Sequence, residues 1–113
     1  MTDISFSILS LPAAQLDNLA SLGYRRMTPI QAASLPLAMA GRDIIGQAKT
    51  GSGKTAAFAL PLLARLNPGD FGTQALIVCP TRELAAQVAA EIRRLARYRQ
   101  NIKVVTLCGG QSI

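Results

Sequence analysis

The feature that most constrains this chain is the stretch AKTGSGKT, which runs from Ala48 to Thr55. Its glycines, lysine and hydroxyl have the spacing of a phosphate-binding loop: a small residue, four others, then Gly-Lys-Thr. A short apolar segment, residues 43–47, leads straight into the loop, and a longer apolar segment with helical spacing follows it. Such a loop joins a strand to a helix, so the stretch predicts an α/β fold built on a parallel sheet.

Each residue type in the loop has its own task in holding a triphosphate. Gly51 and Gly53 let the backbone curve so that N–H groups converge on the β-phosphate, where the dipole of the following helix also attracts negative charge. Lys54 is expected to reach the β- and γ-phosphates, and the Thr55 hydroxyl to bind Mg²⁺. Ala48 stands where the strict motif has Gly. The expected triphosphate contacts are Ala48, Lys49, Thr50, Gly51, Ser52, Gly53, Lys54 and Thr55, with catalytic roles for Lys54 and Thr55.

Apolar periodicity outlines the secondary structure along the whole chain. Helices are expected at residues 12–22, 29–40, 54–66 and 82–98. Strands are expected at residues 43–47, 74–79 and 103–108, with turn residues at 67–70. From residue 43 onward the order is strand, helix, strand, helix, strand. That order predicts a parallel sheet with right-handed crossovers.

Cap residues mark two of the helix starts. Thr28, Pro29 and Gln31 stand at the N-cap, first and third positions of the second helix, which is the arrangement of a capping box. Thr81 is the expected N-cap of the last helix, and Gly41 is expected to end the second one.

Composition narrows the class of protein and of partner. Of the 113 residues 50% are hydrophobic and 16% charged, so the chain can bury the core of one domain. The net charge of +6 favours a polyanion such as RNA or DNA, and fits a merely soluble basic protein equally well. Cys79 and Cys108 have no CxxC spacing and no His accompanies them, so buried reduced thiols are expected. The sequence shows neither a secretory signal nor an apolar run of membrane-spanning length, which favours a cytoplasmic protein without membrane contact.

Motifs on both sides of the loop carry a family resemblance. GYRRMTPIQ, residues 23–31, resembles the Q motif of the DEAD-box RNA helicases, and AKTGSGKT resembles their motif I. PTRELA, residues 80–85, is similar to motif Ia, and Gly109-Gly110 to the GG motif. The chain therefore resembles the first RecA-like domain of this family. Within the family the run from RMTPIQ to LCGGQ resembles the bacterial DbpA group, which is associated with ribosomal RNA.

The resemblance implies that the Q motif reads adenine. Gln31 carries one acceptor and two donors, enough to pair with the adenine edge, and the alternative is a purely structural cap. Phe6 lies 17 residues before Gly23, where the family places the aromatic that stacks on adenine, and the alternative is an apolar anchor. Met27 replaces the usual Pro and is expected to loosen the turn. The adenine-side residues implied are Phe6, Tyr24, Thr28 and Gln31.

The resemblance also implies contacts to the RNA backbone at the carboxyl ends of two strands. Helix-terminal N–H groups and an arginine suit phosphates, and glycine lets the RNA approach closely. The expected RNA-binding residues are Pro80, Thr81, Arg82, Gly109 and Gly110. Arg82 has a solvated surface position as its alternative. A further basic cluster is better explained as a solvated face with Glu91 as partner: Arg93, Arg94, Arg97, Arg99 and Lys103.

The domain organisation follows from the same resemblance. Residues 1–32 form the Q-motif region and residues 33–113 the N-terminal part of the ATP-binding domain. Hydrolysis also needs a metal-binding carboxylate and an arginine finger, and neither Asp70, Glu83 nor Glu91 follows an apolar strand as that carboxylate should. We therefore expect the ATP-gripping front of a two-domain RNA helicase that ends within its first domain. It is expected to be inactive alone and monomeric at full length.

Two other functions fit parts of the pattern. A small-molecule kinase also has a phosphate loop, but its loop usually lies close to the N-terminus, whereas 47 residues precede this one. Preference for ATP over GTP would favour the helicase, because adenine is read by Gln31. A non-catalytic ATP- or RNA-binding module is the second alternative, and a reading frame that continues beyond Ile113 would exclude it.

Overall fold

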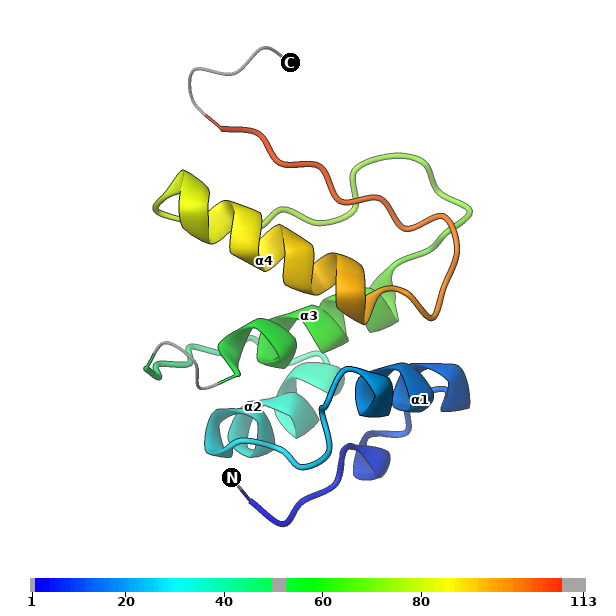
Figure 1. Ribbon diagram of the computed structural model, residues 1–113, viewed down its shortest axis with the longest axis vertical. Helices are drawn as coiled ribbons and strands as arrows, with labels where there is room; N and C mark the ends of the chain where they lie inside the picture. Colours follow the sequence, from blue (N-terminus) through cyan, green and yellow to red (C-terminus); the bar gives the residue numbers. More distant parts are fainter. Residues whose placement is uncertain (1, 50–52, 109–113) are drawn as a thin grey trace.

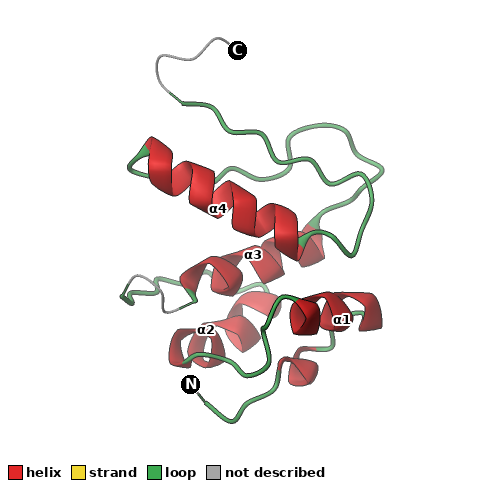
Figure 2. Cartoon of the chain, viewed as in Figure 1, coloured by secondary structure: helices red, strands yellow, loops and turns green. Residues whose placement is uncertain are grey.

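The computed structural model describes residues 2–49 and 53–108, and its regular elements are helices (Figure 2). Four α-helices confirm the predicted ones: α1 (Ala13–Ser21), α2 (Pro29–Met39), α3 (Lys54–Arg65) and α4 (Arg82–Leu95). A short 3-10 helix, η1 (Phe6–Leu9), was not predicted; it begins where the Ser5 side chain accepts a hydrogen bond from the Ser7 N–H. None of the described helices is long and apolar enough to cross a membrane.

The helix starts follow the predicted cap chemistry. At α2 the Thr28 side chain accepts from the Gln31 N–H, while Gln31 Oε1 accepts from the Thr28 N–H at 2.9 Å, which confirms the capping box. At α4 the Thr81 hydroxyl oxygen accepts from the Leu84 N–H at 3.1 Å. Gly41 follows α2 with φ of 90°, a value that favours glycine and so ends the helix there.

The helices are stacked in a row, with α3 between α2 and α4 (Figure 1). Helix α1 packs beside the end of α4, and η1 packs on α2. Fully buried side chains from all layers form one core, among them Leu19, Leu35, Leu60, Leu63 and Leu95. After α4 the chain turns back and runs alongside that helix, where Arg93 Nη2 donates to the Val104 carbonyl oxygen at 2.8 Å (Figure 1).

The N-terminal segment pairs with the loop before α2. Ser5 and Arg26 form an isolated antiparallel bridge, and the Met27 N–H donates to the Ile4 carbonyl oxygen at 2.8 Å. Met27 itself is fully buried. The expectation that Met27 loosens this turn is wrong, because its N–H ties the turn to the N-terminal segment, a bond that proline cannot donate.

The three predicted strands do not form within the described residues, so the expected parallel sheet is wrong for this part of the chain. Inward side chains of two segments, including Cys79 and Val104, pack against the helices. The apolar side chains that point outward are exposed by 71–95%: Ile45, Leu76, Val78, Val105 and Leu107. Parallel strands are stable when neighbouring strands complete the ladder and both faces are covered. Here the helices cover one face only, which explains why the segments stay unpaired.

The exposed apolar side chains predict association of the 113-residue chain in solution, because unpaired apolar backbone recruits other chains. Replacing both Val78 and Val105 by Lys removes apolar surface without touching the core, since these side chains are 85% and 76% exposed. We expect the double variant to show less concentration-dependent light scattering than the parent. The control Ser21→Lys/Gln100→Lys adds the same charge at exposed polar positions and should scatter as the parent does. Equal scattering by all three would contradict this account.

A buried amide predicts a stabilising substitution. Gln15 is 1% exposed, and its Nε2 finds no hydrogen-bond partner among the described residues. A buried polar group without a partner costs on the order of 1 kcal/mol or more. Gln15→Met, which has a similar length, should therefore raise the free energy of unfolding by about 1 kcal/mol, measured by urea denaturation. The exposed Gln100→Met is the matched control, and an effect of the same size there would refute the explanation.

Candidate nucleotide-binding site

The start of α3 has the features of an anion site. Lys54 is the first residue of the helix, and Gly53 before it adopts the left-handed conformation with φ of 91°. In contrast to α2 and α4, no described side chain caps this terminus, as is typical of a helix start that binds an anion. Lys54 is exposed and Thr55 is partly buried. These observations fit a phosphate group at this terminus.

The remainder of the predicted loop is only partly described. Ala48 is partly buried and Lys49 is exposed, and both lead toward the start of α3. Thr50, Gly51 and Ser52 lie outside the described residues. Their expected contacts to phosphate stay predictions.

The Q-motif segment packs directly on Gly53. Gln31 Nε2 donates to the Gly53 carbonyl oxygen at 3.1 Å. A Cβ atom on Gly53 would lie 2.4 Å from Gln31 Nε2 and 2.9 Å from Thr28 Oγ1, closer than such atoms can approach. Gly53 is thus required by its positive φ and by the space that Gln31 and Thr28 occupy. The sequence indicated the glycine but not this second reason for it.

Gln31 uses its amide inside the protein. It is 1% exposed; its oxygen completes the capping box and its nitrogen holds Gly53. The structural role that was open as an alternative is therefore confirmed. Reading of adenine by Gln31 stays a prediction, and it would require this amide to exchange at least one of its present hydrogen bonds.

Phe6 and Tyr24 form an aromatic pair next to the Q motif. Phe6 is 3% exposed, and its ring meets that of Tyr24 edge to face, with centroids 6.0 Å apart and planes at 86°. Phe6 thus anchors the N-terminal segment in the core. Stacking of Phe6 on adenine stays a prediction.

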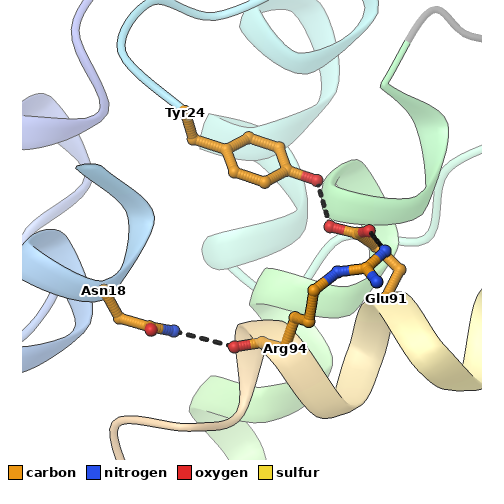
Figure 3. Close-up of polar contacts among 4 residues, drawn as sticks. All are labelled: Asn18, Tyr24, Glu91 and Arg94. Atoms are coloured by element: carbon orange, nitrogen blue, oxygen red, sulfur yellow. Dashed lines mark hydrogen bonds and ion pairs between the residues drawn. The ribbon is translucent and has the colours of Figure 1, made fainter. Parts of the chain in front are cut away.

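Tyr24 also connects the Q-motif segment to α4 (Figure 3). Its hydroxyl donates to Glu91 Oε1 at 2.6 Å, and Glu91 forms an ion pair with Arg94 one turn further along α4. Asn18 of α1 donates to the carbonyl oxygens of Arg94 and Leu95 at 2.9 and 3.2 Å. The last carbonyls of a helix have no partner within it, so Asn18 caps the C-terminus of α4. Spacing predicted Glu91 as partner of the basic cluster, but not the contacts of Tyr24 and Asn18, which span 67 and 76 residues.

The contacts among Tyr24, Glu91 and Arg94 change the pKa values of all three side chains. Burial, and then the hydrogen bond to Glu91, raise the pKa of Tyr24 far above its ordinary value. Burial acts to raise the pKa of Glu91, but hydrogen bonds from Tyr24 and Arg94 outweigh it and hold that pKa below its ordinary value. The bond to Glu91 raises the pKa of Arg94. At neutral pH the cluster is therefore a neutral phenol, a carboxylate and a guanidinium.

The predicted RNA contacts lie near the same site. A groove of about 990 Å³ is lined by Gly53 before α3, by Lys54 and Thr55 on α3, and by Cys79 and Pro80 before α4. Thr81 and Arg82 are exposed at the start of α4. Gly109 and Gly110 lie outside the described residues. Of the described RNA contacts, the structure brings Pro80 to the groove at the start of the phosphate helix, whereas Thr81 and Arg82 do not line it.

Comparison with known proteins identifies the family. The family model described as DEAD/DEAH box helicase matches residues 28–113. The chain belongs to the DEAD/DEAH box helicase family. It is 63% identical over 108 residues to the ATP-dependent RNA helicase DbpA of Escherichia coli K12, which confirms the resemblance to the DbpA group. That match covers 95% of this chain and 24% of the relative, so the chain spans about a quarter of the relative's length.

Solved structures of DEAD-box proteins share the backbone path. A DEAD box protein from the hyperthermophile Methanococcus jannaschii matches with a TM-score of 0.89 and 40% identity, over 96% of this chain and 30% of its own. Dbp5 of S. cerevisiae, bound to RNA and ADP BeF3, matches with a TM-score of 0.79 and 35% identity, over 85% and 25% of the two chains. The likeness covers nearly the whole chain. The segments that form no strand therefore follow the backbone of solved DEAD-box proteins, in accord with the predicted RecA-like α/β fold class.

The cluster around Tyr24 predicts how the stability of this DEAD-box chain depends on pH. Tyr24 has a raised pKa when folded, so its contribution is complete below pH about 10 and is lost as the pH rises above that value. Glu91 has a lowered pKa, so its contribution is lost as the pH falls below about 4.3. We expect Tyr24→Phe to cost about 1 kcal/mol at pH 8, since the cluster is partly solvated. Denaturant unfolding at pH 4, 8 and 10.5 should show that the difference in unfolding free energy between Tyr24→Phe and the parent is smaller at pH 4 and 10.5 than at pH 8. A difference that stays constant would contradict this account of the cluster.

Proposed function

We propose that this chain is the ATP-binding front part of an ATP-dependent RNA helicase, in which ATP hydrolysis is coupled to local opening of RNA duplexes. The observation that carries the proposal is the start of α3, which no described side chain caps, with Gly53 before it and Lys54 and Thr55 as its first two residues. This terminus shares a groove with the residues that precede α4. The printed name of the E. coli relative, an ATP-dependent RNA helicase, supports the same reading.

For ATP, the first N–H groups of α3 would bind phosphate, Lys54 would neutralise its charge and the Thr55 hydroxyl would bind Mg²⁺. The nucleotide supplies the phosphoryl group that is transferred to water. Adenine would lie beside the Q-motif segment, where Gln31 can exchange its bond to Gly53 or to Thr28 for the base edge. Because Gln31 also caps α2, binding of adenine would change the hydrogen bonds at the start of that helix.

For RNA, the start of α4 is the proposed grip. The N–H groups near Thr81 and the guanidinium of Arg82 suit backbone phosphates, and such contacts hold RNA without reading its sequence. Dbp5, which shares this backbone path, is bound to RNA and ADP BeF3 in its structure. Ribosomal RNA is the proposed target, by analogy with the DbpA group.

Hydrolysis and unwinding are proposed for a protein of the relatives' length. The described residues hold no group of three or more His, Cys, Asp and Glu side chains that could bind a metal ion. A hybrid in which this chain replaces the matched segment of E. coli DbpA would place the site in such a protein. It allows the roles of single residues to be measured.

In this hybrid protein, Lys54→Ala should abolish binding of ATP, because the charge that balances the phosphates is lost. Arg82→Ala should leave ATP binding unchanged and weaken binding of single-stranded RNA roughly 5-fold or more, the effect of one phosphate contact. Fluorescence titrations with labelled ATP and labelled polyuridylate measure both.

The matched controls are Lys103→Ala and Arg97→Ala, which remove one positive charge each near the far end of α4. Both should bind ATP and RNA as the parent does. Normal ATP binding by Lys54→Ala would contradict the phosphate site, and equal losses of RNA from Arg82→Ala and Arg97→Ala would contradict the grip at the start of α4.

A further inference from the structure

The contact between Tyr24 and Glu91 joins two parts of the chain that have different proposed ligands. Tyr24 lies in the Q-motif segment, on the side of the nucleotide, and Glu91 lies in the helix whose start is the proposed RNA grip. The hydroxyl of Tyr24 is the donor, and the carboxylate of Glu91 is the acceptor (Figure 3). Hydrogen bonds to a charged acceptor are among the stronger ones in proteins.

On the nucleotide side, hydrogen bonds and the backbone of residues 25–27 connect the start of α3 to Tyr24. Gly53, which precedes α3, is held by Gln31, and Gln31 is joined to Thr28 by the capping box. The adjacent Met27 is buried and tied to Ile4, and the Tyr24 N–H donates to the Leu19 carbonyl oxygen at 2.9 Å. Hydrogen bonds thus hold the backbone on both sides of Tyr24, and residues 25–27 connect it to the capping box that Gln31 completes.

On the RNA side, Glu91 is held in place within a continuous helix. Its second carboxylate oxygen pairs with Arg94, and Asn18 caps the carbonyls at the end of α4. Helix α4 has 14 residues without an internal proline or glycine, so a displacement at Glu91 moves its start, where Thr81 and Arg82 lie, as one body.

The Tyr24–Glu91 bond differs in kind from the other packing between these elements. Helices α3 and α4 also meet through apolar side chains of the core, such as Leu60 and Ile92. Apolar packing is not directional, and helices in contact slide past one another at small cost. A hydrogen bond of 2.6 Å fixes one atom against another, so it sets the position of α4 relative to the Q-motif segment.

We propose that Tyr24 is a positioning residue that couples the nucleotide site to the RNA grip by holding α4 through Glu91. The inference rests on the proposed function. When nucleotide shifts Gln31, the Tyr24–Glu91 bond carries the shift to the start of α4. The affinities for the two ligands then depend on each other, and by linkage the dependence is reciprocal. Phenylalanine in place of Tyr24 keeps the aromatic packing and removes only this connection.

The test measures the affinity of the hybrid protein for labelled single-stranded polyuridylate, with and without the ATP analogue AMP-PNP and Mg²⁺. The ratio of the two dissociation constants is the coupling factor. Tyr24→Phe should lower this factor about threefold or more. The measurements with AMP-PNP are made at a saturating concentration, so the ratio does not depend on how tightly each variant binds the nucleotide. A merely structural role would lower the melting temperature but leave the ratio unchanged.

Matched variants separate the contact from general damage. Glu91→Gln keeps an acceptor for the phenol and should retain the coupling factor, whereas Glu91→Leu should lower it as Tyr24→Phe does. In the Glu91→Leu background, Tyr24→Phe should cause no further loss, because the shared contact is already gone. Tyr98→Phe, which removes a phenol hydroxyl beyond the end of α4, should leave the factor unchanged.

Two results would overturn the inference in distinguishable ways. A parent-like coupling factor in Tyr24→Phe, with coupling present in the parent, would refute the role of Tyr24 and leave the proposed function intact. Failure of the parent hybrid to bind AMP-PNP at all would refute the proposed function, and the inference with it.

Discussion

The close approach of Gln31 to Gly53 is the interaction on which the rest of the site depends. Gly53 must have a positive φ to start α3, and it must lack a side chain because Gln31 and Thr28 fill the space beside it. One contact therefore holds the start of the phosphate helix against the start of α2. The same two residues, Thr28 and Gln31, complete the capping box, so the geometry of α2 and of the loop are set together.

Much of the fold could be predicted because its signals are local. Cap residues such as Thr28 and Thr81, the glycine at position 41 and the apolar periodicity each act within one turn of their own helix, and all four α-helices were predicted within a few residues. The strands could not be decided in this way. An apolar run such as residues 74–79 indicates that the segment packs against the core, but it does not indicate which segment lies beside it. A strand exists only when another segment completes its hydrogen bonds.

The site was predictable to the same extent. The spacing of Gly53, Lys54 and Thr55 indicated the phosphate terminus directly, and the structure places these residues at a helix start that no described side chain caps. The second use of Gln31, as a clamp on Gly53, depends on contact between segments 22 residues apart and leaves no periodic signal. The Tyr24–Glu91 bond is of the same kind, since Tyr and Glu at these positions are ordinary surface residues until the fold brings them together.

The unpaired segments show which part of the chain positions the site. In the described residues no ladder joins the segments before α3 and α4, yet the backbone follows that of a DEAD-box protein with a TM-score of 0.89. The placement of Lys54 relative to Thr81 must therefore come from the helices: α2 and α4 packed on either side of α3, and α1 capping α4. Two polar contacts add directional constraints to this packing: Gln31 to Gly53 at the proposed nucleotide site, and Tyr24 to Glu91 between the Q-motif segment and α4. The helical layer thus positions the described part of the site without a strand ladder beside it.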